Sequence, residues 1–160
     1  MMKLLKFCVI LFSSFFASNL NAVEPENIMV IEVEGEANGV IEIELLPNIA
    51  PLHVERIKIL ARDGLYNGVV FHRVIDGFMA QTGDVKFGKI EGYKRRYAGQ
   101  GGSNYPDLDA EFSTIKYEEG TVGMARAQNP NSANSQFFIM FNRSPNLDGK
   151  IGRASCRERV

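Results

Sequence analysis

The stretch FHRVIDGFMAQTGD, residues 71–84, combines polar side chains that could do chemistry with the apolar and aromatic content of buried strands. Its polar candidates are the cation Arg73, the amide Gln81 and the imidazole His72. The stretch contains no Ser, Cys or Lys that could act as a nucleophile. A fixed donor in a dry, apolar pocket stabilises charge more strongly than it does in water. These residue types therefore favour catalysis by an oriented donor over covalent catalysis.

Two further segments have a similar mixture of apolar strand residues and polar loop residues. GTVGMARAQNPNSANSQFFIMF spans residues 120–141, and SPNLDGK spans residues 144–150. Together with residues 71–84, they occur in the order and spacing of the cyclophilin-type peptidyl-prolyl isomerases, and the chain resembles this family over most of residues 28–150. The resemblance implies a mainly β fold, a cyclophilin-like antiparallel β-barrel with capping helices.

The resemblance also implies an activity, the acceleration of rotation about X-Pro peptide bonds in folding polypeptides. Such a bond resists rotation because amide resonance gives it partial double-bond character, and uncatalysed interconversion takes tens to hundreds of seconds. Rotation localises a lone pair on the prolyl nitrogen. A donor aimed at that nitrogen binds the twisted state better than either planar state. An arginine, which stays charged, suits this role.

By the same resemblance, the catalytic residues are Arg73, the donor, and Gln81, which orients Arg73 and the substrate backbone. The remaining site residues bind the substrate: Phe78, Met79, Phe138 and Leu147 as apolar walls, Gln136 near Gln81, and the backbone at Ala125 and Arg126. Taken singly, each of these residues is compatible with an ordinary structural place in a strand or a core. Their joint occurrence in this order favours the site. The family pattern gives His72 no catalytic role.

The resemblance implies no metal and no organic cofactor. The expected partners are unfolded or extended polypeptides that contain proline. Cyclosporin-type ligands are a further candidate class, although Asn146 stands where eukaryotic members often carry tryptophan. An alternative function is a catalytically weak module that binds proline peptides, or a holdase chaperone. Arg73 favours the enzyme, because a pure binder needs no charge aimed at a prolyl nitrogen.

The elements that must position these residues follow from the hydrophobic period. Apolar and acidic residues alternate on both sides of Asn38-Gly39, which predicts a β-hairpin with one wet face. Residues 50–62 carry apolar side chains at helical spacing, which predicts an amphipathic helix packed on a sheet. His53, near the start of this helix, is expected at the surface.

Short strands are predicted in the remainder of the chain. VVFHRVI and FMAQ flank the turn dipeptide Asp76-Gly77, and GTVGMARA and SQFFIMF flank a polar loop. The segment 85–111 is rich in glycine and too long for a simple turn. Such loops in compact domains tend to be functional or mobile. Its YKRRY run is interpreted as a solvated loop rather than a nucleic-acid contact.

Charge and cysteine content limit the possible functions. The chain has 160 residues and a formal net charge of −1, whereas residues 23–150 carry 13 Lys and Arg against 18 Asp and Glu, a net charge of −5. This balance argues against a general binder of nucleic acid or of anionic membranes. No cysteine lies between residues 23 and 150. The domain is therefore expected to depend on its hydrophobic core without a disulfide.

The sequence predicts an exported bacterial protein. In residues 1–22, Lys3 and Lys6 flank the start of an apolar run that leads to a small-residue stretch ending at Ala22. This pattern is typical of a cleaved secretory signal. A membrane anchor is the less favoured interpretation, because a span needs about 20 apolar residues. We therefore expect a periplasmic location without stable membrane insertion after cleavage.

Residues 23–150 are expected to form the isomerase domain, incomplete at its C-terminal end. The family continues after this point with further strands and a helix that close the barrel. Residues 151–160 are short and basic, and they have neither a strand nor a helix pattern. We therefore expect this segment to be a non-native tail, and a chain that stops there to be inactive by itself.

The signal pattern leads to a first prediction, a mature N-terminus at Val23. Cleavage after Ala22 follows from the small residues that end the apolar run. Mass spectrometry of the N-terminal peptide of the exported protein is the measurement. Recovery of an intact Met1 terminus from the membrane fraction would instead support an anchor.

Overall fold

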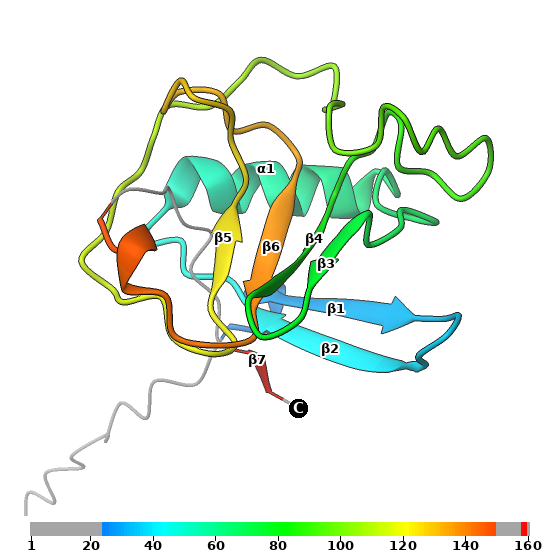
Figure 1. Ribbon diagram of the computed structural model, residues 1–160. Helices are drawn as coiled ribbons and strands as arrows, with labels where there is room; N and C mark the ends of the chain where they lie inside the picture. Colours follow the sequence, from blue (N-terminus) through cyan, green and yellow to red (C-terminus); the bar gives the residue numbers. More distant parts are fainter. Residues whose placement is uncertain (1–23, 150–157, 160) are drawn as a thin grey trace, which may run out of the picture.

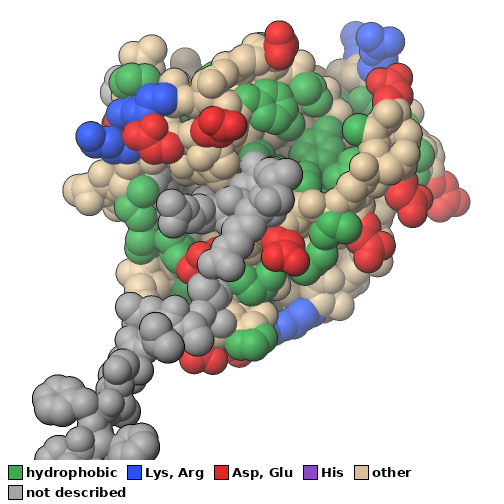
Figure 2. Space-filling view, turned by 90° about the horizontal axis from the view of Figure 1, so that it is seen from below, with side chains coloured by type: hydrophobic (Ala, Val, Ile, Leu, Met, Phe, Trp, Pro, Cys, Tyr) green, Lys and Arg blue, Asp and Glu red, His purple; other side chains and the backbone are tan. Residues whose placement is uncertain are grey.

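The computed structural model describes residues 24–149 and 158–159. The expected signal, residues 1–22, and residues 151–157 and 160 of the expected tail lie outside the described residues. No helix in the described part is long and apolar enough to cross a membrane. Figure 2 shows one face of the molecule, over which acidic side chains are scattered between apolar ones.

The described strands form two antiparallel sheets (Figure 1). The first sheet has the order β1-β2-β7 and contains β1 (Ile28–Val33), β2 (Gly39–Glu44) and β7 (Glu158–Arg159). The second has the order β3-β4-β6-β5 and contains β3 (Arg73–Ile75), β4 (Met79–Thr82), β5 (Val122–Met124) and β6 (Phe137–Met140). The described helices are α1 (Pro51–Arg62) and the 3-10 turns η1 (Pro25–Asn27) and η2 (Pro145–Leu147). The mainly β, antiparallel fold is confirmed, as two sheets rather than one closed barrel.

The predicted hairpin is present, but its connection is longer than expected. Val33 in β1 pairs with Gly39 in β2, so residues 34–38 connect the strands and Asn38-Gly39 is not a two-residue turn. The side-chain oxygen of Asn38 accepts a hydrogen bond from the backbone N–H of Gly35 at 3.1 Å. Asn38 thus closes the longer loop with its side chain.

Helix α1 receives its N-terminal cap from a distant residue. Ala50 precedes the helix and has no side chain that could cap it. The carboxylate of Glu111 instead accepts hydrogen bonds from the backbone N–H groups of Leu52 and His53, both at 3.0 Å. The same carboxylate bonds Nδ1 of His53, whose side chain is fully buried. The prediction of a surface His53 is wrong, because its partner lies 58 residues away in the chain.

Strand β6 joins two hydrophobic clusters. Phe137 and Ile139 pack in the larger cluster, which includes Val54 and Ile57 of α1. The alternate residues, Phe138 and Met140, pack in a second cluster with Met79 and Tyr117. Successive strand residues point to opposite faces of a sheet. The four buried residues of β6 therefore fix the helix on one face and leave the other face for the second cluster.

Gly123 in β5 makes room for the second cluster. It pairs directly with Phe138 across the sheet. A Cβ at this position would lie 2.6 Å from Oη of Tyr117 and 2.7 Å from Cζ of Phe138. The two rings stack with centroids 5.9 Å apart and planes at 22°. The absence of a side chain at Gly123 is thus what admits the stacked pair.

The connection between β4 and β5 is ordered around Asp84 at its start. The Asp84 carboxylate is fully buried and accepts four backbone N–H groups, at 2.7 to 3.1 Å, from Lys86, Phe87, Gly99 and Gly101. Burial alone would raise the pKa of this carboxyl, but the four donors outweigh burial and hold the pKa below its ordinary value of 3.8. The first half of the long loop is therefore wrapped around one carboxylate.

The close approach at Gly123 gives a prediction for Gly123→Ala. The added methyl group must displace Tyr117 or Phe138, and overpacking of a core costs about 1–3 kcal/mol. Urea denaturation of the variant should show this loss of unfolding free energy. Gly39→Ala is the matched control, since nothing lies within 4 Å of a Cβ there, and it should stay within about 0.5 kcal/mol of the parent. Equal stability of the two variants would contradict the packing argument.

The depressed pKa of Asp84 predicts a loss of stability in acid. The pKa of Asp84 is below 3.8 in the folded protein, so as pH falls the carboxyl is protonated in the unfolded state before it is protonated in the folded state. Its contribution is therefore complete above about pH 4 and is lost as pH falls through the native pKa. Unfolding free energies measured against pH should show that Asp84→Asn is less stable at neutral pH, by about 1–3 kcal/mol, and varies less in acid. An acid profile parallel to that of the parent would count against this assignment.

Candidate active site

Strand register places four residues in one row across the second sheet. Arg73 in β3 pairs with Gln81 in β4, Gln81 pairs with Phe138 in β6, and Phe138 pairs with Gly123 in β5. Residues directly opposite one another point to the same face of a sheet. The cation, the amide and the aromatic ring are therefore neighbours although they are far apart in sequence.

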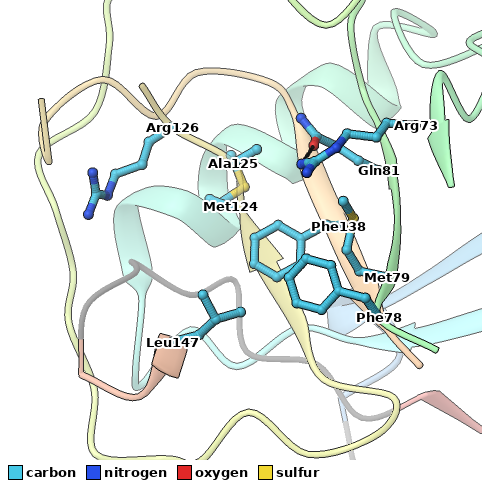
Figure 3. A pocket seen from close by; sticks show the side chains of 9 residues that line it. All are labelled: Arg73, Phe78, Met79, Gln81, Met124, Ala125, Arg126, Phe138 and Leu147. Carbon is cyan, nitrogen blue, oxygen red and sulfur yellow. Dashed lines mark hydrogen bonds between the residues drawn. The ribbon is translucent and has the colours of Figure 1, made fainter. Parts of the chain in front are cut away.

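This row borders a pocket of about 440 Å³ (Figure 3). The pocket is lined by Arg73, Phe78, Met79, Gln81, Met124, Ala125, Arg126, Phe138 and Leu147. These are all of the predicted site residues except Gln136, with Met124 in addition. Met124 could not be predicted as a site residue, because its side chain belongs to the core that packs against α1. In Figure 3, Arg73 and Gln81 lie at one end of the pocket, the rings of Phe78 and Phe138 lie in the middle, and Leu147 lies across from Arg73.

The apolar walls of the pocket are supported from behind. Met79 and Phe138 are only 2% and 7% exposed, and the buried ring of Tyr117 stacks against Phe138. Leu147 lies at the end of η2, and the following residue, Asp148, accepts a hydrogen bond from the backbone N–H of Tyr117 at 2.8 Å. The walls therefore form one packed unit with Tyr117 at its centre.

Arg73 is oriented by a chain of side-chain amides. Its Nη1 donates to Oε1 of Gln81 at 3.3 Å, and Nε2 of Gln81 donates to Oε1 of Gln136 at 2.9 Å. Nε2 of Gln136 in turn donates to the carbonyls of Gly99, at 3.1 Å, and Gly101, at 2.7 Å. Gln136 thus stands behind Gln81, and it lines a second, adjoining hollow of about 580 Å³.

His72 lies beneath the loop that carries Gly99. A Cβ at Gly99 would lie 3.1 Å from the His72 ring, and Gly99 has a φ of +88°. Both the close contact and the positive φ favour glycine at this position. Burial lowers the pKa of His72, and the neighbouring Asp84 only partly offsets this effect. A histidine with a lowered pKa is neutral at pH 7. The imidazole therefore adds no second charge beside Arg73.

Ala125 and Arg126 border the pocket in different ways. The backbone N–H of Ala125 donates to the carbonyl of Gln136 at 2.8 Å, so pairing with a substrate at Ala125 would use its carbonyl. Nη1 of Arg126 donates to the carbonyls of Ala127 and Gln128, and in Figure 3 its guanidinium points away from Arg73. The predicted contribution of Arg126 through its backbone stays a prediction.

The chemistry open to this pocket is limited by its lining. The lining residues include no Ser, Thr, Cys, Lys, His, Asp or Glu, so none of them offers a nucleophile or a general acid or base of ordinary pKa. What remains is a charged donor fixed beside an apolar surface. Within the described residues, no cluster of three or more His, Cys, Asp or Glu is placed to hold a metal ion.

Comparisons with known proteins show the family to which this chain belongs. The family model described as cyclophilin type peptidyl-prolyl cis-trans isomerase/CLD matches residues 28–153. A protein of Brucella suis biovar 1, named as a probable peptidyl-prolyl cis-trans isomerase, is 58% identical over 131 residues, which cover 81% of this chain and 65% of the relative. This chain therefore spans less than two thirds of the length of that relative.

Solved structures share the fold. A cyclophilin from Hirschia baltica superposes with a TM-score of 0.67 at 29% identity, covering 86% of this chain and 65% of that one. A cyclophilin-type isomerase from Cryptosporidium parvum, solved in the presence of the dipeptide Ala-Pro, gives a TM-score of 0.65 at 28% identity over 76% of this chain and 73% of its own. The fold is thus cyclophilin-like, as expected, and the match over most of the described residues means that this chain belongs to the cyclophilin-type peptidyl-prolyl cis-trans isomerase family.

Proposed function

We propose that this protein is a peptidyl-prolyl cis-trans isomerase that accelerates rotation about X-Pro bonds in unfolded or extended polypeptides. The observation that carries the proposal is the placement of Arg73. Its guanidinium is held by Gln81 at one end of an apolar pocket, and the pocket is lined by aromatic and aliphatic side chains. A charged donor beside a surface suited to a prolyl ring is the combination that this reaction needs.

In the proposed mechanism, the prolyl ring packs against Phe138, Met79 and Leu147 while the preceding carbonyl rotates. The twisted amide loses its resonance and gains a localised lone pair on nitrogen. Arg73 donates to that lone pair and so stabilises the twisted state more than either planar state. Gln81 fixes the guanidinium through the 3.3 Å hydrogen bond, which reduces the reorganisation needed when the lone pair develops.

The nature of the pocket supports an isomerase over a hydrolase. Bond cleavage would need a nucleophile or an activated water, and the lining residues supply no group for either. Rotation breaks no covalent bond and needs no proton transfer. A catalytically weak binding module or holdase would use the same apolar walls, and it would not depend on the charge of Arg73.

The proposed substrate class is proline-containing peptide in an extended conformation. The shared fold with the Cryptosporidium parvum isomerase, which was solved in the presence of Ala-Pro, supports this class. So does the position of Ala125, just beyond the end of β5, where an extended chain could pair with the backbone. We also propose a periplasmic location in a bacterium, which the signal-like residues 1–22 and the Brucella relatives support.

Arg73→Ala tests the mechanism. Removing one preorganised electrostatic donor costs about 100- to 1000-fold in rate, so kcat/KM for a proline peptide should fall by about two orders of magnitude or more. The assay follows cis-trans isomerisation in the full-length protein encoded at the genomic locus. Arg62→Ala, which removes an exposed arginine at the end of α1, is the matched control and should keep the parent rate.

Two outcomes would separate the candidate functions. A parent protein that isomerises the peptide, with Arg73→Ala much slower, supports the isomerase. If Arg73→Ala isomerises the peptide as fast as an active parent, the donor assignment is wrong. If the parent and the variant both bind the peptide and neither accelerates its isomerisation, the binding module is favoured.

A further inference from the structure

We infer that Asp84, a buried carboxylate that does not line the pocket, is a positioning residue for Arg73. The inference rests on the proposed function, because it concerns how the isomerase donor is held. Asp84 acts through the loop backbone at Gly99 and Gly101 and then through the two amides that lead to Arg73. It does not touch the substrate.

The loop backbone connects Asp84 to the first amide. Gly99 and Gly101 each donate their N–H to Oδ2 of Asp84, at 2.7 and 3.0 Å. The carbonyls of the same two residues accept hydrogen bonds from Nε2 of Gln136, at 3.1 and 2.7 Å. One side of this loop is therefore fixed by the carboxylate, and its other side presents two acceptors at one point.

These two acceptors determine which way each amide faces. Both carbonyls require the NH₂ of Gln136, so its Oε1 must point to Gln81 and accept from Nε2 there. The remaining atom of the Gln81 amide, Oε1, then faces Nη1 of Arg73. If the loop carbonyls turned away, both amides could rotate, and Gln81 would present a donor to a guanidinium that can only donate.

A carboxylate is the group that suits this position. Its two oxygens accept all four backbone N–H groups, two at each oxygen. An asparagine would direct an NH₂ group at one of these pairs of donors. A Cβ at Gly101 would overlap Oδ1 of Asp84, so the loop can wrap around the carboxylate only because glycine stands there.

The effect on catalysis follows from the exposure of Arg73. The Arg73 side chain is long and solvent-exposed, so it can adopt many rotamers. The hydrogen bond from its guanidinium to Gln81 restricts these rotamers. Small displacements of a catalytic group are costly, since misplacement by about 1 Å can reduce the rate about 100-fold. Loss of Asp84 should therefore lower kcat, whereas the apolar walls that hold the prolyl ring should stay unchanged.

The test is a double-mutant cycle of Asp84→Asn and Arg73→Ala in the full-length protein, assayed well below the melting temperature of each variant. Asp84→Asn should lower kcat about 10-fold or more and change KM by less than about twofold. In the Arg73→Ala background the same substitution should have no further effect, within about twofold. Such non-additivity is the signature of a residue that acts through Arg73.

The hydrogen bonds that lead from Asp84 through the loop backbone, Gln136 and Gln81 to Arg73 form an amide relay. Glu111→Gln is the matched control, because it converts a second carboxylate that accepts backbone N–H groups into an amide outside this relay. It should lower the melting temperature and keep the parent kcat. If Asp84→Asn behaves like this control, or slows the Arg73→Ala enzyme by the same factor as the parent, the inference is wrong. A parent protein without isomerase activity would instead overturn the proposed function itself, and an Arg73→Ala variant as fast as the parent would overturn its donor mechanism.

Gln136→Met keeps the inference testable should Asp84→Asn fail to fold. It breaks the relay one link later and leaves the carboxylate and its four donors in place. We expect a similar fall in kcat that again disappears in the Arg73→Ala background. A parent-like kcat for Gln136→Met would overturn the relay.

Discussion

The arrangement of the candidate site depends on the pairing register of the second sheet. Arg73, Gln81, Phe138 and Gly123 belong to four different strands, and only their mutual pairing puts them in one row. A shift of one residue in β6 would exchange Phe138 for Phe137 and turn the pocket wall toward α1. The residues of β6 are buried on both faces, so a shifted register would also disrupt the core. Packing of the helix thus protects the geometry of the pocket.

Two sets of contacts form the site, an apolar layer and a polar layer, and they have different effects. The apolar layer, with Tyr117 behind Phe138, gives the pocket its shape through close packing that tolerates no side chain at Gly123. The polar layer, from the loop carbonyls through Gln136 to Gln81, gives the guanidinium its direction. The two layers meet at the β4–β6 pair, where Gln81 lies opposite Phe138.

Patterns of short range could be predicted from the sequence, and contacts of long range could not. The strands around Asp76-Gly77 and the helix at residues 51–62 follow from the hydrophobic period. The motif residues of the pocket follow from the resemblance to the family. The burial of His53 does not, because an isolated histidine near a helix start gives no sign of a glutamate 58 residues later. Likewise, nothing near Asp84 in the sequence indicates that Gly99 and Gly101 return to it, since only the folded loop brings their N–H groups together.

The long loop is fastened near both ends by carboxylates, with Asp84 at its start and Glu111 at its close. Between these points, the stretch around Tyr93 and Tyr97 is largely exposed. The entropy of closing a loop grows slowly with length, by only about 0.6 kcal/mol for each doubling. Insertions or deletions in this stretch should thus be tolerated, which would let related proteins diversify one outer surface while the amide relay and the helix cap stay unchanged.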